Sequence, residues 1–459
     1  MAAHTSFRAA ALAALLVALA APVRAGDAPG LRLATFDVDA TPPVGAHLAY
    51  NPCENRGELG LRARGVILTG ADRPVVLCAV DWVGIGGGGH DAFRQALADA
   101  AGTTAERVAV HTVHQHDAPG CDFTAERLLK DHGITPRRYE GAFHRELLAR
   151  LADAVRAATD RTRPVTHLGI GVAEVKEVAS NRRIMGPDGK AGPMRGSACK
   201  DPALRAAPGG LIDPELTLVS FWDGGAPLAV LSYYAVHPQS YYRTGVANPD
   251  FPGIARFLRQ LAVPEALHIH FNGAGGNVAA GKYNDGAHEN RRVLADRLAD
   301  AMRRAWEATR RVPVGAGEVR WTVAPVALPP GPHLDKAALE ARMTSEKDMV
   351  VVEDCARKLG WLEFCSSGRR IELACLAMGP IRILHLPGEP FVEYQLAAKA
   401  AARPGILAAV AGYGDYAPGY IGTAAAYGEG GYETEPRSSN VAPEVEAALM
   451  GGIKKLLAE

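Results

Sequence analysis

Imidazole side chains gather in one short stretch of the sequence, residues 107–120 (RVAVHTVHQHDAPG). His111, His114 and His116 stand near the end of a run of β-branched residues that closes in Asp-Ala-Pro-Gly. This pattern predicts a buried strand that gives way to a loop at about His114. Side chains two residues apart point to the same side of an extended chain, so His114 and His116 could face one cleft. Because neutral imidazole is the commonest metal ligand among side chains, the stretch predicts a metal site.

The three histidines also have a structural interpretation. A single histidine at a strand end is more often a hydrogen-bonded part of the core than a ligand, and we favour that role for His111. The pair His114 and His116, beside Asp117, favours metal binding. The spacing argues against a metallo-β-lactamase-like His-x-His-x-Asp-His motif, which needs a residue between His116 and the aspartate and a further histidine.

Further residues of ligand type follow other apolar runs that we interpret as strands. They are His237 after residues 227–236, Glu389 after residues 381–386, and Tyr413, Tyr416 and Tyr420 after residues 406–410. In α/β proteins, ligands bind in the crevice beyond the strand ends, so these side chains are expected to converge. A mixed nitrogen and oxygen set suits zinc with an open position for water. The structural alternatives are a turn histidine for His237 and a carboxylate at a helix N-terminus for Glu389.

A glycine-rich turn, residues 272–277 (NGAGGN), follows the predicted strand 267–271. It lacks the Lys-Ser/Thr ending of a phosphate-binding P-loop and the Gly-x-Gly-x-x-Gly order of a dinucleotide site. We therefore interpret it as a tight turn that lets the backbone approach the cleft.

Charge and the N-terminal segment bound the class of protein. The 50 basic and 50 acidic side chains balance, and no basic cluster stands out, which argues against nucleic acid or an anionic surface as a partner. Residues 1–25 combine a basic start, an apolar run and a small-residue ending at Ala25, the form of a secretory signal peptide. We therefore expect an exported, periplasmic or extracellular protein that starts near Gly26 and has no transmembrane segment after signal removal.

The segments after the signal alternate between predicted strands and helices. The strands are expected at 31–39, 62–68, 74–81, 108–113, 165–175, 216–221, 227–236, 267–271, 319–328, 370–377, 381–386 and 406–410. The helices are expected at 91–101, 139–158, 251–261, 287–308, 336–347, 391–401 and from 443 onward. Roughly 430 residues exceed one typical core, so two domains or one large α/β domain are possible. Without an internal repeat or a linker, we expect a single α/β domain over residues 26–459.

Two irregular features complete the inventory. Residues 180–213 crowd Gly, Pro, Arg and Lys without periodicity, and a loop this long is usually functional or disordered. Seven cysteines in an exported chain permit up to three disulfides, with Cys121 and Cys199 as candidate loop staples. No Cys-x-x-Cys pair occurs, which argues against a zinc ribbon.

Several of these segments match motifs of one known family. The loop 114–120 (HQHDAPG) is similar to the family's His-Thr-His-Ser-Gly-Pro-Gly, 235–237 to its Ala-Val-His, and 387–389 to its Pro-Gly/Ala-Glu. Residues 420–423 (YIGT), with Tyr427 and Tyr432, look like its Tyr-Ile/Val-Thr-Thr segment, and 181–182 like the start of its Asn-Arg-Ser-Pro loop. From about residue 31 to 440 the chain thus resembles the N-terminal catalytic domain of the neutral/alkaline (non-lysosomal) ceramidases. The C-terminal immunoglobulin-like domain of that family has no counterpart here.

The resemblance implies a fold of mixed β-sheets flanked by helices, and it implies roles for seven residues. His114, His237, Glu389 and Tyr420 would hold one Zn²⁺ ion, His116 and Tyr432 would act on the substrate carbonyl, and Arg182 would lie at the substrate. In such a site zinc activates water and polarises an amide carbonyl, an imidazole carries the proton to the leaving amine, and a phenol donates to the oxyanion.

The chain departs from the family at one motif. The family's Gly-Asp-x-Ser-Pro-Asn falls on residues 276–281, where Asn277 replaces the aspartate and Ala279 the serine. We therefore expect an exported zinc-dependent hydrolase that cleaves an amide (N-acyl) bond in a small-molecule or lipid-like substrate other than long-chain ceramide. The alternatives are a metal-dependent esterase or lactonase, and a non-catalytic metal-binding protein. The missing hydroxyl at Ala279 favours the non-catalytic alternative, and retention of His116 and Tyr432 argues against it.

Overall fold

Three β-sheets with one shared pattern of connection form the fold. The computed structural model describes residues 30–458, so the predicted signal peptide, residues 1–25, lies outside the described residues. In each sheet, three antiparallel strands in sequence order are followed by a helix and then by a fourth strand, which pairs parallel to the third. The predicted α/β class with mixed sheets is confirmed, and the repeated topology is a feature that the sequence did not indicate.

Each of the three sheets contains four or five strands, which lie side by side in the order named. The first sheet contains β5 (Val108–Thr112), β3 (Val75–Val80), β2 (Arg62–Thr69), β1 (Arg32–Asp39) and β7 (Arg163–Pro164). The second contains β12 (Leu267–Asn272), β11 (Ala226–Tyr234), β10 (Glu215–Asp223), β8 (His167–Glu174) and β14 (Arg310–Pro313). The third contains β15 (Val319–Val326), β16 (Ile371–Met378), β17 (Ile381–His385) and β19 (Leu407–Ala411). Short pairs are formed by β4 (Gly84–Ile85) with β6 (Gly120–Cys121), β9 (Ser180–Asn181) with β13 (Val278–Ala279), and β18 (Glu389–Pro390) with β20 (Tyr420–Ile421).

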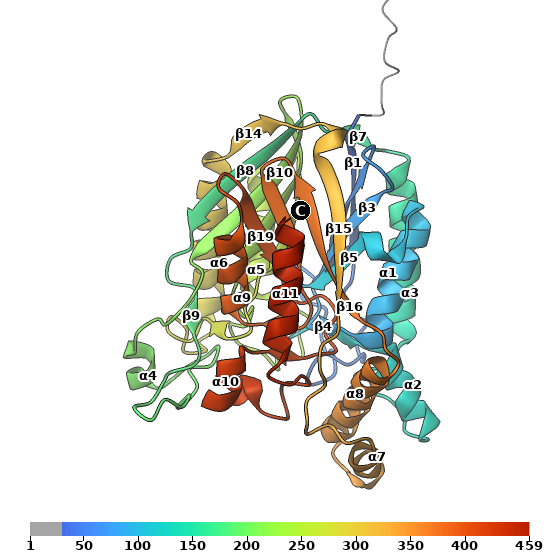
Figure 1. The fold of residues 1–459 in the computed structure, drawn as a ribbon, viewed down its shortest axis with the longest axis vertical. Helices are drawn as coiled ribbons and strands as arrows, with labels where there is room; N and C mark the ends of the chain where they lie inside the picture. Colours follow the sequence, from blue (N-terminus) through green and yellow to red (C-terminus); the bar gives the residue numbers. More distant parts are fainter. Residues whose placement is uncertain (1–29, 459) are drawn as a thin grey trace, which may run out of the picture.

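Each sheet carries two helices on its outer face. They are α1 (Gly87–Ala101) and α3 (Ala142–Thr159) on the first sheet, α5 (Asp250–Ala262) and α6 (Glu289–Glu307) on the second, and α9 (Val392–Ala401) and α11 (Val445–Ala458) on the third. A separate group contains α2 (Phe123–Asp131), α7 (Lys336–Ser345) and α8 (Met349–Ser366). Two short helices, α4 (Pro202–Ala206) and α10 (Ala424–Glu429), and the 3₁₀ turns Ala105–Arg107, Ala316–Glu318 and Tyr432–Thr434 complete the inventory. Figure 1 shows α1 and α3 along one side of the sheets, α6 along the opposite side and α11 in front.

The core is built between the three sheets and under the helices. One central cluster takes side chains from all three sheets, such as Leu77, Leu231 and Ile383, each fully buried. Outer clusters seal the opposite faces, for example Phe93 and Leu147 from the helices that cover the first sheet. With both faces covered, the third and fourth strands read as continuous apolar runs, which is why sequence periodicity located them.

The parallel pairs determine where a site can form. In each sheet the third and fourth strands run in the same direction, so their carboxyl ends meet at one edge. The loops that leave these ends carry His114 and His116 after β5, His237 after β11, Glu389 after β17, and Tyr420 after β19. A crevice beyond the carboxyl ends of strands is the usual binding place in such folds.

Most expected strands and helices lie within a few residues of their predicted bounds, but α2 and α8 and the short helices α4 and α10 were not predicted. Helix α8 begins after Asp348, whose carboxylate caps the amide of Val350, and its first turn is a run of valines, which favours a strand locally. Packing against α2 and α7 overrides that preference. Helix α2, capped by Asp122, directly follows the histidine loop and was also missed.

The irregular stretch 180–213 is ordered, not disordered. Arg195 is 1% exposed and donates hydrogen bonds to five backbone carbonyls, those of Asn181, Leu204, Ala207, Pro208 and Gly209. One buried guanidinium thus replaces the regular hydrogen bonding that the segment lacks.

The expected disulfides are absent from residues 30–458. Cys121 and Cys199, the candidate loop staples, carry buried free thiols, and none of the other cysteines is cross-linked. Cys121 packs in the core under the first sheet as a small apolar side chain. That part of the prediction is wrong, because spacing gives no information about which thiols meet. None of the helices in residues 30–458 is long and apolar enough to cross a membrane.

Candidate metal centre

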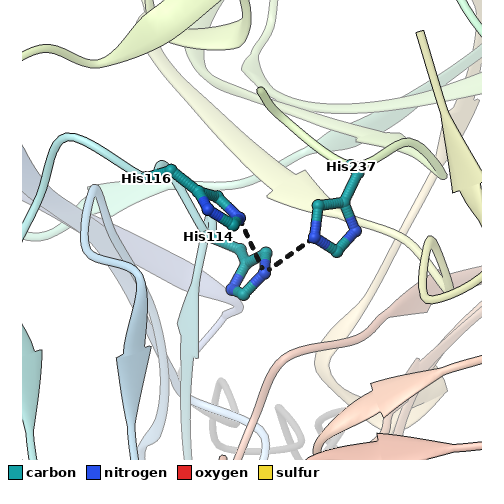
Figure 2. Close-up of side chains that lie close together, drawn as sticks. All are labelled: His114, His116 and His237. Atoms are coloured by element: carbon teal, nitrogen blue, oxygen red, sulfur yellow. Dashed lines mark hydrogen bonds between the residues drawn. The ribbon is translucent and has the colours of Figure 1, made fainter. Parts of the chain in front are cut away.

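Three side chains from three different strand ends bring their donor atoms together. Nε2 of His114 lies 3.2 Å from Nε2 of His237 and 3.2 Å from Oε2 of Glu389, and the His237 to Glu389 distance is 3.6 Å. Two atoms bound to a tetrahedral zinc at about 2.0–2.1 Å lie roughly 3.3–3.4 Å apart. The observed separations therefore match the ligand set of one zinc ion. Figure 2 shows the rings of His114, His237 and the neighbouring His116 turned toward one another.

The hydrogen bonds behind the rings determine which nitrogen faces the centre. Nδ1 of His114 lies 2.5 Å from the carbonyl oxygen of Val83, and Nδ1 of His237 lies 3.3 Å from that of Gly275. A carbonyl oxygen accepts only, so each Nδ1 carries a proton and Nε2 is the atom that each ring turns toward the centre. Backbone carbonyls behind metal-ligating histidines fix the tautomer in the same way. Both rings are therefore prepared as ligands.

The three facing donor atoms are buried and of ligand type. Burial lowers the pKa of His237 well below its ordinary value, so its ring is neutral. Burial alone would raise the pKa of Glu389, but His114, the Tyr416 hydrogen bond and Arg182 outweigh it and keep the carboxyl ionised. Oε2 of Glu389 has no hydrogen-bond partner among residues 30–458. A buried carboxylate oxygen without a hydrogen-bond partner that faces two imidazole nitrogens is a set of donors that a cation would satisfy, so these residues fit a metal ion.

Tyr420 lies beside the three donor atoms, where a fourth metal ligand would stand. Its Oη lies 3.4 Å from Nε2 of His237 and 3.1 Å from Nη2 of Arg182. Burial raises the pKa of the Tyr420 phenol well above its ordinary value, and Arg182 acts in the opposite direction. Arg182 is itself buried and paired with Glu433 at 3.0 Å, so it contacts the phenol from behind and does not line the cavity described below.

His116 differs from the other two histidines in its partner. Its Nδ1 lies 2.8 Å from the hydroxyl of Tyr50, whereas Nδ1 of His114 and of His237 each meets a carbonyl. Nε2 of His116 lies 3.3 Å from Nε2 of His114, so it is also within reach of the centre. Burial lowers the pKa of His116 well below its ordinary value, which leaves a neutral ring able to accept a proton. This arrangement suits proton transfer beside the metal position.

Tyr432 stands on the same side of the cavity as Tyr420. The two rings meet edge to face with their centroids 5.7 Å apart, and Tyr432 lines the cavity. Burial raises the pKa of Tyr432, so its hydroxyl keeps its proton at neutral pH and can donate it in a hydrogen bond.

Three tyrosines support the centre from outside the predicted set of seven. Tyr416 donates to Oε1 of Glu389 at 2.7 Å, Tyr50 bonds to His116, and Tyr413 stacks on His114 with ring centroids 4.6 Å apart. Tyr413 and Tyr416 stood among the ligand-type residues after the last strand. Tyr50 was missed, and no local signal marks it, because it lies in an irregular loop before β2.

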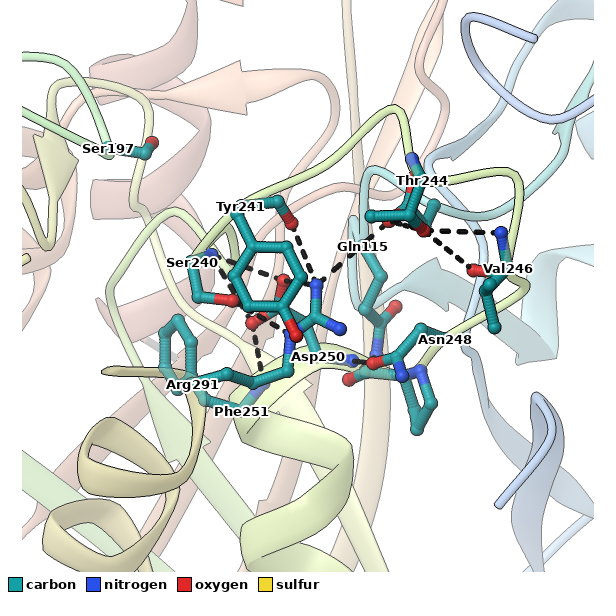
Figure 3. Close-up of polar contacts among 12 residues, drawn as sticks. Gln115, Ser197, Ser240, Tyr241, Thr244, Val246, Asn248, Asp250, Phe251 and Arg291 are labelled. Atoms are coloured by element: carbon teal, nitrogen blue, oxygen red, sulfur yellow. Dashed lines mark hydrogen bonds and ion pairs between the residues drawn. The ribbon is translucent and has the colours of Figure 1, made fainter. Parts of the chain in front are cut away.

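A polar network fixes the loop between β11 and α5 against the histidine loop. The carboxylate of Asp117 accepts hydrogen bonds from the amides of Arg243 and Thr244 and from the Thr244 hydroxyl. Figure 3 shows the adjoining contacts, in which Arg291 of α6 bonds to the Ser240 hydroxyl and to the Tyr241 carbonyl. Asp117 therefore holds the loop in place beside His116, and its oxygens are occupied by these donors.

A cavity of about 650 Å³, open to solvent, begins at the centre. Its lining includes His114, His116, Glu389, Tyr420 and Tyr432 of the centre, together with Asp122, Arg138, Tyr139 and Arg357. The cavity gives a substrate direct access to the metal position.

The altered motif has become structural. Ala279 is fully buried in β13, which pairs with β9, and its carbonyl accepts the Ser180 hydroxyl at 3.0 Å. Asn277 bonds to the Val392 amide and to the carboxylate of Glu393. The turn is therefore packed against α9, and Ala279 has no hydroxyl that could reach the cavity.

Of the comparisons with known proteins, the one with solved structures gives matches. No protein-family model and no curated protein matches the sequence. Among solved structures, the chain is similar to neutral ceramidase from Pseudomonas aeruginosa, with a TM-score of 0.66 and 16% identity over 94% of this chain and 74% of that one. A ceramidase complexed with C2 gives a TM-score of 0.67 and 16% identity over 93% and 75% of the two chains. The fold is ceramidase-like, which confirms the resemblance found in the sequence at the level of the fold.

Proposed function

We propose that this chain is an exported zinc-dependent hydrolase that cleaves an amide (N-acyl) bond. The observation that carries the proposal is the meeting of Nε2 of His114, Nε2 of His237 and Oε2 of Glu389, all buried, at 3.2–3.6 Å. Tyr420 would complete the ligand set. The signal-like residues 1–25 support export.

A zinc ion held there would supply Lewis-acid polarisation of the substrate carbonyl and a lowered pKa for water. Since Nδ1 of His116 is bonded to Tyr50, Nε2 is the atom at which this ring exchanges a proton with water or with the leaving amine. The Tyr432 hydroxyl, kept protonated by burial, would donate a hydrogen bond to the oxygen that gains charge in the transition state. Arg182 would act through Tyr420, by fixing the phenol that it contacts.

The choice of an amide bond rests on the structural neighbours. Both neighbours are ceramidases, and they share the fold over more than nine tenths of this chain. Ala279 stands where that family has a serine, so the proposal excludes long-chain ceramide and favours a smaller N-acyl compound.

The test combines metal analysis with a substrate panel. Purified mature protein is analysed for zinc by mass spectrometry and assayed on short N-acyl amides, the matching esters and a short-chain ceramide. About one zinc per chain with amide turnover supports the proposal. Turnover of esters alone would replace it with a metal-dependent esterase or lactonase. Zinc without turnover would favour a non-catalytic metal-binding protein, and a protein that binds no zinc would refute the centre.

A further inference from the structure

Two arginines line the cavity in addition to the residues of the metal centre. Arg138 comes from the loop between α2 and α3, and Arg357 comes from α8, the helix that the sequence did not reveal. Both line the same cavity as His114, His116 and Glu389. They have no part in the metal centre or in the proton transfer proposed above.

Arg138 has unused hydrogen-bonding capacity. Its Nε is buried and has no hydrogen-bond partner among residues 30–458, and its guanidinium forms no ion pair with a carboxylate of that part of the chain. The carboxylate of Glu353 accepts hydrogen bonds from the backbone amides of Arg137 and Arg138, at 2.8 Å each, and it attracts the Arg138 guanidinium without forming an ion pair with it. The guanidinium also interacts with the phenols of Tyr139 and Tyr50. A buried donor without an acceptor is costly, so the position suits an anion supplied by a ligand.

Arg357 is compensated only in part. It pairs with Asp354 at 2.8 Å, but the same carboxylate also pairs with Lys358 at 2.5 Å, so two cations share one anion. Apart from Glu389, the cavity lining contains one carboxyl group, that of Asp122. Burial and the neighbouring Asp415 raise the pKa of Asp122 to about 7, so near neutral pH it carries only part of a charge. The part of the cavity lined by the two arginines is therefore positive.

Both arginines interact electrostatically with tyrosines that support the centre. They are Tyr50, whose hydroxyl bonds to His116, and Tyr416, whose hydroxyl bonds to Glu389. An anion bound by the arginines and a carbonyl group placed at the metal position would therefore occupy the same cavity.

We propose that Arg138 and Arg357 bind an anionic group of the substrate, so that the preferred substrate is a short amide with a carboxylate or phosphate within a few bonds of the scissile carbonyl. This rests on the proposed hydrolase function. Guanidinium groups recognise both anions by charge-assisted hydrogen bonds, and the cavity volume accommodates a compound of this size.

The experiment compares matched substrates on matched variants of the zinc-loaded protein. Hexanoylglycine carries the carboxylate, hexanoylethanolamine is its neutral counterpart, and the O-phosphate of the latter tests a phosphate in the same place. Arg138→Gln removes the charge and Arg138→Lys keeps it. Arg137→Gln is the control, because Arg137 is exposed, adjoins Arg138 and uses only its backbone amide in the Glu353 contact.

We expect the wild type to prefer an anionic substrate over the neutral one about ten- to a hundredfold in kcat/KM, the usual contribution of a charge-assisted hydrogen bond. Arg138→Gln should remove most of that preference, chiefly by raising KM for the anionic substrate. Arg138→Lys should retain part of the preference, and Arg137→Gln should retain all of it. The anion that shows the larger preference identifies the group as carboxylate or phosphate.

Equal turnover of charged and neutral substrates by the wild type, or equal preferences in Arg138→Gln and Arg137→Gln, would overturn the inference while leaving the hydrolase function intact. If no compound of the panel is cleaved, the hydrolase function fails, and calorimetric titration with hexanoylglycine and hexanoylethanolamine tests anion binding by itself. Should Arg138→Gln fail to fold, as judged by its thermal melt, Arg357→Gln takes its place in both assays.

Discussion

Two groups of histidines differ in chemistry although they begin only three residues apart in the sequence. One includes His111 of β5, and the other includes His114 of the loop that follows. His114 and His116 belong to the candidate metal centre, together with His237. His111 belongs to a second pair, in which its Nε2 lies 2.9 Å from Nδ1 of His385. Both groups are buried and both join strands from different sheets. The number and the burial of the histidines therefore do not distinguish them.

The distribution of protons distinguishes the two groups. Nδ1 of His111 donates to the carbonyl of Gly412 at 2.6 Å, and burial lowers the pKa of His111 to about 3, so the ring is neutral and its Nε2 is an acceptor. His385 then donates from Nδ1 to that acceptor. Each close contact of this pair holds one proton. In the metal centre Oε2 of Glu389 has no hydrogen-bond partner and faces Nε2 of His114 and of His237, so a cation fits there and is not needed at His111.

The strongest way to break this comparison is to remove a ligand. His237→Ala should lower bound zinc from about one equivalent to well below that and reduce hydrolysis roughly a thousandfold, because several kcal/mol of charge stabilisation depend on the metal. Zinc content by mass spectrometry, with turnover on the same samples, measures both effects. His111→Ala is the matched control and should retain its zinc. A His237→Ala protein that keeps a full equivalent would remove His237 from the ligand set.

The division of roles inside the metal group gives the next effect. His116→Ala should keep the zinc and lose about 10²–10⁴-fold in kcat, because the neutral ring bonded to Tyr50 transfers a proton and is not required as a ligand. Metal analysis and kcat on the best substrate decide the matter. Loss of zinc together with turnover would instead make His116 a ligand, and a wild-type kcat would exclude it from the mechanism.

The second pair should affect stability and leave the metal unchanged. His111→Ala removes the hydrogen bonds to Gly412 and His385 and opens space in the core, so the free energy of unfolding should fall by about 1–3 kcal/mol. Urea unfolding of the metal-free proteins measures the change without a contribution from zinc binding. If His111→Ala destabilised the zinc-loaded protein but not the metal-free one, His111 would belong to the metal centre after all.

The smallest expected effect on stability comes from two buried carboxyl groups, which differ in their pKa. Glu389 is kept ionised by its neighbours, whereas burial and Asp415 raise the pKa of Asp122 to about 7. An acid whose folded pKa lies above its unfolded value loses stability as the pH rises from about 4 through 7, because the unfolded chain releases the proton first.

In the Asp122→Asn variant the side chain is uncharged at every pH. It still caps α2, because the asparagine oxygen can also accept hydrogen bonds from the amides of Thr124 and Ala125. The variant should match the wild type in stability near pH 4 and exceed it at pH 8. Urea unfolding at the two pH values checks this, and a difference that does not change with pH would contradict the assignment for Asp122.

The sequence by itself determined which residues follow the buried strands. Strand ends can be found from apolar runs and turn residues, and ligand-type side chains stand directly after them at His114, His237 and Glu389. The order of the motifs also indicated the ceramidase-like fold. These features are local, so a single sequence contains them.

The tertiary structure alone decided how those ends meet and what lies opposite them. His114 and His237 are 123 residues apart, and only the repeated pairing of parallel strands brings their Nε2 atoms together. The partners that set the tautomers are backbone carbonyls, and Tyr50 and Arg357 come from a loop and a helix with no functional pattern of their own. Proton positions and cavity linings depend on contacts between distant segments, and periodicity along the chain carries no information about such contacts.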